Sequence, residues 1–194
     1  MPQRSAREQS ATPPPELLQA SGPASAIASI PRTDCGDFDI RIAADGTWLY
    51  RDSPIGRPAL VKLFATVLKR DAAGDYWLET PAERGRIAVE DAPFVAVEAD
   101  YEGEGERQQA TIRTNIDQRV TLGEDHPLIL RGSADAPRPY VALGGGLEAL
   151  VSRNVFYGMV ERAAPRRVGG VETLGLWSGG RFFALEPVPS EDAP

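Results

Sequence analysis

The chain has 194 residues, of which 42% are hydrophobic and 25% are charged, a composition typical of a globular protein with one domain or two small ones. Its formal net charge of −7 at pH 7 argues against nonspecific binding to nucleic acid or anionic lipid, because such binding depends on a basic face. Cys35 is the only cysteine, which excludes an internal disulfide or a metal site of several cysteines and indicates a cytoplasmic location.

Residues 1–32 are rich in proline, alanine, serine and glutamine, so they can bury little apolar surface, and we expect a mostly mobile tail. This segment lacks a charged start followed by an unbroken apolar core. No apolar run in the sequence approaches the roughly 20 residues that cross a membrane. We therefore expect neither export nor membrane insertion.

A first α+β unit is predicted over residues 33–102. It begins with a β-hairpin whose turn contains Asp45 and Gly46, residues that tolerate positive φ. Pro58 suits the first turn of a helix. The apolar residues that follow recur at spacings of three and four, which predicts one core-facing helix side: Leu60, Leu63, Phe64, Val67 and Leu68. Three short strands are then predicted, at 75–80, 85–90 and 93–102.

A second α+β unit is predicted over residues 103–190, with strands before and after one helix. The helix is expected from Leu147 to about Arg162, after a triple glycine at 144–146. Its inward stripe is predicted from apolar spacing: Leu147, Leu150, Val151, Val155 and Met159. The last strands are expected at 173–178 and 181–186.

The two units share small landmarks in the same order, which predicts an internal duplication. The clearest is an Asp-x-Pro motif, which begins at Asp52 in the first unit and at Asp125 in the second. If the motifs correspond, Ser53 and His126 face a common cleft between the units. The two aspartates would then fix their loops through local backbone hydrogen bonds.

Long blocks of the sequence resemble the bacterial Domain of Unknown Function 1285 family. The blocks include CGDFDIRIAADGTWLYRDSPIGRPALVKLF from Cys35 and the WSGGRFF ending, and the match runs from about Cys35 to Leu185. The resemblance implies two similar α+β units, each superficially like a pleckstrin-homology fold, with a ligand cleft where they meet. It also implies a signalling role with a nucleotide-like ligand, under oxidative stress.

His126 is the only histidine, so any histidine-based acid–base step must use it. Three interpretations stay open: a catalytic residue, a hydrogen bond to a ligand or partner, and a structural histidine. A nucleophile would have to be brought to it, and the sequence has no G-x-S-x-G elbow. A lone histidine also makes a typical zinc site improbable, and we expect no metal and no cofactor.

Arg57 and Arg153 are the candidate anion-binding cations. Arg57 precedes the first predicted helix, where a cation opposes the helix dipole by roughly 0.3–1 kcal/mol. It is therefore either retained to reach an anion or simply solvated. Arg153 lies on the side of the second helix opposite the apolar stripe, where it either lines a cleft or is solvated. The glycines at 144–146 are a weak phosphate-binding signal, since no P-loop motif accompanies them.

Aromatic and amide side chains complete the candidate set. Tyr157 and Trp177 can stack on a base, although strand aromatics usually belong to the core. Asn115 follows a strand and suits either a base edge or a turn.

From these residues we expect a cytoplasmic binding protein whose inter-unit cleft takes a small anionic, nucleotide-like ligand as the input to a regulatory pathway. Two alternatives remain: a hydrolase-type enzyme that uses His126, and an interaction module or homodimer. Direct DNA binding is not expected. Cys35 lies beside Asp34 and Asp37, which should raise the pKa of its thiol and make it a poor oxidant sensor.

Overall fold

The computed structural model describes residues 33–133 and 136–186, which belong to one compact unit that starts at Pro31. The tail predicted over 1–32 lies outside the described residues, as do residues 187–190 of the predicted second unit. Among the residues that are described, no helix is both long and apolar enough to cross a membrane.

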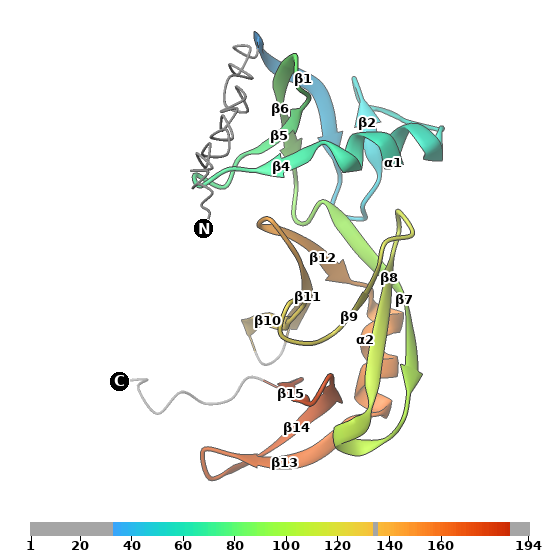
Figure 1. Ribbon diagram of the computed structural model, residues 1–194, viewed down its shortest axis with the longest axis vertical. Helices are drawn as coiled ribbons and strands as arrows, with labels where there is room; N and C mark the ends of the chain where they lie inside the picture. Colours follow the sequence, from blue (N-terminus) through green and yellow to red (C-terminus); the bar gives the residue numbers. More distant parts are fainter. Residues whose placement is uncertain (1–32, 134–135, 187–194) are drawn as a thin grey trace, which may run out of the picture. The chain divides into compact units, whose positions relative to one another are not determined.

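The first sheet has six strands in the order β3-β2-β1-β6-β5-β4 (Figure 1). Its elements are β1 (Thr33–Ile42), β2 (Trp48–Tyr50), β3 (Ser53–Pro54), α1 (Pro58–Thr66), β4 (Leu68–Arg70), β5 (Tyr76–Glu79) and β6 (Glu83–Val89). The β1–β2 hairpin turns at Gly46, which has a φ of 82°, as Asp45-Gly46 predicted. The first and last strands pair in parallel, with Ile42 opposite Val89.

The second sheet also has six strands, in the order β10-β11-β12-β7-β8-β9. Its strands are β7 (Phe94–Glu102), β8 (Gln109–Thr114), β9 (Arg119–Thr121), β10 (Leu128–Ser133), β11 (Ala136–Gly144) and β12 (Leu147–Val151), with a short 3-10 turn, η1 (Gly105–Arg107), between β7 and β8. The helix α2 (Arg153–Glu161) follows. A three-stranded sheet ends the described chain, with β13 (Ala164–Val168), β14 (Val171–Ser178) and β15 (Arg181–Ala184).

The two large sheets have the same topology. In each, three strands form one meander and three form another, and the first and last strands pair in parallel: β1 with β6, and β7 with β12. The expectation of an α+β fold built from two similar sheet-rich units is confirmed. We call the first sheet with α1 the first unit, and the second sheet with α2 and β13–β15 the second unit. Residues 93–102, which the sequence placed in the first unit, contribute β7 to the second sheet.

This topology shows that the predicted internal alignment is wrong. The turn between β2 and β3 corresponds to the turn between β8 and β9, so the equivalent of Asp52 is Asp117 and not Asp125. Both aspartates have positive φ, 60° and 64°. Each carboxylate pairs with an arginine of its own sheet, Asp52 with Arg41 at 3.2 Å and Asp117 with Arg113 at 2.9 Å. Asp52 therefore forms an ion pair with an arginine of β1, whereas we expected it to form a local backbone hydrogen bond.

The helix predicted from Leu147 was also wrong over its first five residues. Residues 147–151 form β12, in which Ala149 and Val151 are buried in alternation, and the triple glycine turns β11 into β12 with positive φ at all three positions. The stripe residues Val155 and Met159 are buried on α2 as expected. The short and mostly apolar run LEALV fits both helix and strand periods, so only the glycines before it could distinguish the two.

The buried core is continuous from the first sheet to the third, and includes Ile42, Trp48, Phe94, Met159 and Leu176. The helix α1 contributes no fully buried side chain. Leu63, predicted to face the core, is 60% exposed. The two helices thus differ in packing, because α2 lies against β7 and β14 whereas α1 covers the first sheet incompletely.

Candidate functional site

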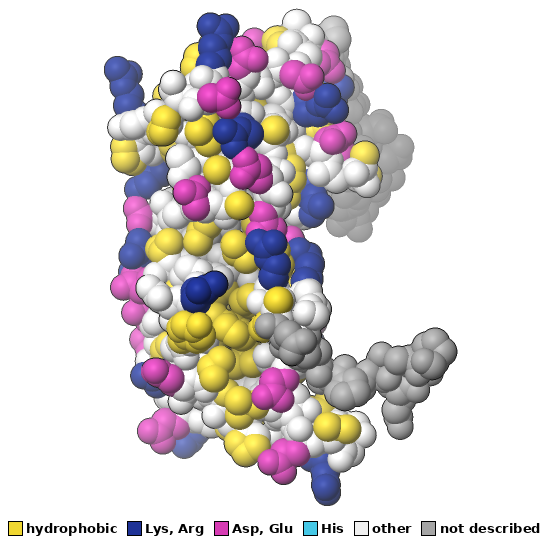
Figure 2. All heavy atoms as spheres, turned by 180° about the vertical axis from the view of Figure 1, so that it is seen from behind, with side chains coloured by type: hydrophobic (Ala, Val, Ile, Leu, Met, Phe, Trp, Pro, Cys, Tyr) yellow, Lys and Arg dark blue, Asp and Glu magenta, His cyan; other side chains and the backbone are white. Residues whose placement is uncertain are grey.

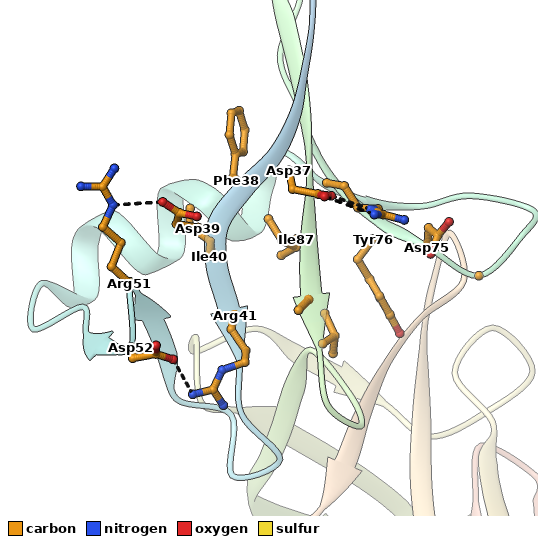
Figure 3. A pocket seen from close by; sticks show the side chains of 14 residues that line it. Asp37, Phe38, Asp39, Ile40, Arg41, Arg51, Asp52, Asp75, Tyr76 and Ile87 are labelled. Carbon is orange, nitrogen blue, oxygen red and sulfur yellow. Dashed lines mark hydrogen bonds and ion pairs between the residues drawn. The ribbon is translucent and has the colours of Figure 1, made fainter.

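A cavity of about 800 Å³ forms a charged groove along β1 and β6 (Figure 3). It forms where the register of the parallel pair shifts between Asp37 and Arg41. Its arginines already have partners: Arg51 donates to Asp39 at 3.0 Å, and Arg86 to Asp37 at 2.7 Å. The hydrogen bond from Arg86 lowers the pKa of the Asp37 carboxyl. The groove therefore has little spare positive charge for an anionic ligand.

A second cavity, of about 620 Å³, lies at the start of α2 in the second unit. Strands β11 and β12 and the first turn of α2 provide its described lining: Ala136, Pro137, Arg138, Pro139, Leu150, Val151, Arg153, Phe156 and Tyr157. None of these is acidic, although the whole protein has a net charge of −7. Its size falls within the range of small-molecule sites.

The described lining of this cavity contains two arginines, of which one is paired and one is not. Arg138 pairs with Asp91, whose side chain is only 15% exposed, while the arginine itself stays 53% exposed. Asp91 also accepts a hydrogen bond from the Tyr140 hydroxyl at 2.8 Å, so it holds β11 in place. Arg153 has no ion-pair or hydrogen-bond partner among the described side chains. It is the uncommitted cation of the site.

Aromatic surface lies beside these cations. Tyr157 is 57% exposed on α2, one turn after Arg153, and Phe156 lies next to it in the cavity lining. Figure 2 shows hydrophobic side chains gathered over the region of α2 and the adjoining strands. Exposed aromatic rings can stack on a planar ring at little conformational cost.

The first turn of α2 also favours the binding of an anion. The residue before the helix, Ser152, makes no side-chain hydrogen bond to the helix start, and the first turn has no acidic residue. Free backbone N–H groups and the positive end of the helix dipole therefore face the same region as Arg153. Together these groups can bind an anion joined to a planar ring.

The structure separates the predicted site residues into two pairs and three single residues. Arg153 and Tyr157 share the α2 cavity. Ser53 and Arg57 share another cavity, of about 440 Å³, between β3 and α1. None of the described cavities contains Ser53 together with His126, and the strand correspondence does not make them equivalent.

Asn115 is a structural clamp between the units. Its backbone N–H and side-chain oxygen pair with the backbone of Val95 at 2.8 and 3.1 Å, and its side-chain amide donates to Gly46 O at 3.2 Å. The side-chain oxygen and amide of Asn115 therefore both have partners within the protein, and the turn interpretation of Asn115 fits better than the ligand interpretation.

His126 and Trp177 also have partners within the protein. The Nδ1 atom of His126 lies 2.9 Å from Ala142 O, so Nδ1 carries the proton and donates. Trp177 packs edge-on against Phe182 with ring centroids 5.4 Å apart, and the Arg166 guanidinium lies 4.7 Å from its ring centroid. Within 33–133 and 136–186, no cluster of three or more histidine, cysteine or acidic residues is placed to hold a metal ion.

The sequence prediction did not include Arg138 and Phe156. Arg138 stands between two prolines in the run APRPY, to which the sequence analysis assigned no binding role. An arginine flanked by prolines and followed by a strand is the signal that could have identified it. Its position beside Arg153 depends on β11 pairing with β12, which the residue pattern did not show.

Cys35 supports a separate prediction about reactivity. Its Sγ lies 3.7 Å from Glu83 Oε2, and desolvation, followed by the charge of Glu83, raises the pKa of the thiol. The predicted direction is confirmed, although Glu83 has replaced Asp37 as a cause. We expect native protein to react more slowly with iodoacetamide at pH 7 than glutathione does, because little thiolate is present. Glu83→Gln should accelerate the reaction, and an unchanged rate would contradict the assignment.

Two family models match the chain in tandem. The N-terminal domain of DUF1285, described as a domain of unknown function, matches residues 30–92, and its C-terminal domain matches residues 93–185. The chain therefore belongs to the DUF1285 family. A comparison with curated proteins finds no match.

Two solved structures support this assignment. A DUF1285 family protein from Silicibacter pomeroyi DSS-3 is 38% identical, with a TM-score of 0.75, over 89% of this chain and 92% of that one. A DUF1285 family protein from Shewanella baltica OS155 is 28% identical, with a TM-score of 0.50, over 64% of this chain and 91% of that one.

Proposed function

We propose that this protein is a small-molecule sensor of a regulatory pathway, and that its α2 cavity binds an anionic, nucleotide-like ligand. The main supporting observation is the cavity itself, whose described lining has no acidic residue and includes the unpaired Arg153 beside Arg138, which is held by Asp91. In this proposal Arg153 and the first turn of α2 bind the phosphate, and Tyr157 stacks on the base. The single cysteine agrees with a reducing, cytoplasmic environment.

The assignment differs from our first expectation in its location. We expected the ligand in a cleft between the units, whereas the cavity lining comes entirely from the second unit. The first unit contributes indirectly, because Asp91 follows β6 and holds Arg138. A binding role is also favoured over hydrolysis by His126, whose ring is partly buried and bonded to Ala142 O.

A thermal-shift screen tests the proposal. Nucleoside phosphates and cyclic nucleotides at millimolar concentration should raise the melting temperature by about 5 °C or more for the correct ligand. The reason is that a ligand at about 100 times its Kd adds roughly 2.7 kcal/mol to the native state. Arg153→Gln should weaken that ligand about tenfold, through loss of a charge-assisted hydrogen bond. Its own stability should change by less than about 0.5 kcal/mol.

Arg57→Gln is the matched control, because Arg57 is likewise an exposed arginine at a helix start but lies in the other unit. Equal weakening by both variants would show only a general charge effect. If no nucleotide changes the melting temperature and sedimentation gives a concentration-dependent mass, the proposal fails. Exposed Tyr157 and Val160 would then indicate a protein-binding surface or homodimer.

A further inference from the structure

The helix α1 lies over the first sheet without completing a core. Its sequence, PALVKLFAT, is mostly apolar, yet none of its residues is fully buried. Leu60 and Phe64 are only partly buried, and both line the cavity of about 440 Å³ between α1 and β3. Phe64 stacks on Trp48 of the core, with ring centroids 6.2 Å apart, on the same helix whose residues line this space. Burial of apolar surface is favourable, so the space beneath α1 suits an apolar ligand.

The walls of this α1 cavity are almost wholly apolar. Its described lining residues come from β1, β2, β3, the loop after β3 and α1, and none is acidic: Ile40, Tyr50, Ser53, Pro54, Ile55, Gly56, Arg57, Leu60 and Phe64. A neighbouring cavity of about 400 Å³ shares Ile40, Tyr50 and Phe64 with it and continues to Val67 and Leu78. Its lining also includes three acidic residues, so only its apolar part extends the space for an aliphatic chain: Asp37, Asp39 and Glu83. The two spaces together favour an elongated chain over a compact ring.

Among the described residues that line the α1 cavity, Arg57 is the only charged one. It is exposed, and it has no ion-pair or hydrogen-bond partner among the described side chains. The residue stands just before α1 in an extended conformation, with φ −119° and ψ 95° and no side-chain bond to the helix start. An unpaired guanidinium beside an apolar cavity is complementary to a carboxylate, which it can bind through two parallel hydrogen bonds.

We propose that the α1 cavity binds an aliphatic carboxylate, with the chain beneath Leu60 and Phe64 and the carboxylate on Arg57. Ser53 lies at the same cavity and provides a hydroxyl donor near the carboxylate. A nucleotide fits this site poorly, because a phosphate chain would meet only one cation and the base would gain few hydrogen bonds from apolar walls. This site is separate from the α2 cavity and does not rest on the function proposed for it.

Calorimetry with the full chain tests the proposal, using decanoate below its micelle concentration as the probe and decanol as its uncharged match. Decanoate should bind, and Arg57→Gln should weaken it about tenfold while leaving decanol unchanged, because only the charge-assisted hydrogen bonds are lost. Arg153→Gln is the control and should leave decanoate binding unaltered.

A blocking variant locates the site. Ser53→Phe places a ring at the cavity wall and should weaken decanoate and decanol alike. Gly56→Leu is a second blocking variant, since a Cβ added at Gly56 meets no atom within 4 Å and the fold should tolerate it. Thermal unfolding confirms that each variant is folded. The proposal is overturned if decanoate does not bind. It is also overturned if Arg57→Gln binds decanoate as tightly as the unmodified protein does, or if decanoate still binds to both blocking variants.

Discussion

Ser178→Ala is expected to lower the free energy of unfolding by about 2–4 kcal/mol, because it leaves two buried backbone groups without a partner. Ser178 is fully buried. Its Oγ accepts a hydrogen bond from the Ala110 N–H at 2.9 Å and donates one to Leu122 O at 2.7 Å. One hydroxyl therefore joins the three-stranded sheet to the second large sheet.

Denaturant unfolding measures this loss, and hydrogen exchange at the Ala110 amide locates it. Thr111→Ala is the control, because it removes a hydroxyl from the same strand at a half-buried position, where the hydroxyl bonds to that of Thr121. That change should stay within about 0.5 kcal/mol. A similarly small loss for Ser178→Ala, with an unchanged exchange rate at Ala110, would show that the bridge does not hold the third sheet.

Gly46→Ala is expected to destabilise the contact between the units by about 2–5 kcal/mol, the sum of an overpacking cost and a backbone cost. An added Cβ would lie 2.7 Å from Asn115 Nδ2 and 2.8 Å from Val95 Cγ2, so the clamp made by Asn115 would have to move. Overpacking of this kind typically costs about 1–3 kcal/mol. The positive φ of Gly46 adds about 1–2 kcal/mol for a residue with a side chain.

Gly36→Ala separates these two costs. Gly36 has a similar φ of 73°, but nothing lies within 4 Å of its added Cβ, so only the backbone term should remain. Chemical denaturation of the two variants should therefore differ by the overpacking cost. Equal losses would mean that the Asn115 clamp adjusts freely.

The sequence could predict those features of the fold that depend on the local chemistry of one or two residues. Gly46 marked a turn because it reaches positive φ at little cost, and Pro58 marked the start of α1 because its fixed φ suits a first helical turn. Both features depend on one or two residues and their neighbours. The same is true of Val155 and Met159, whose spacing of four identifies a buried helix face.

Pairings between distant strands could not be predicted in the same way. The parallel contact of β7 with β12 places Phe94 opposite Ala149, and nothing in the local sequence around either residue identifies the other as its partner. The repeat was therefore aligned on Asp-x-Pro, a turn motif that is common without duplication. The true correspondence, Asp52 with Asp117, shares a backbone conformation and an arginine partner but no sequence motif.

The candidate site follows the same division. Arg153 and Tyr157 were identified from their own chemistry and their place near a helix. Arg138 was missed because its proximity to them is created by sheet pairing. Asn115 and Trp177 were suited to a ligand by residue type, but the fold uses their side chains internally, in the Val95 clamp and in the contact with Phe182.

In each six-stranded sheet, the strand made first pairs in parallel with the strand made last, β1 with β6 and β7 with β12. This pairing determines when each sheet can be completed as the chain leaves the ribosome. Val89 must be synthesised before the first sheet can close around Ile42, and Ala149 before the second can close around Phe94. The neighbouring hairpins need only local contacts, which form faster than pairings between distant segments. Vectorial synthesis therefore lets the N-terminal half close while most of its C-terminal counterpart is still being translated, so that two tandem halves with identical strand order are kept from exchanging strands.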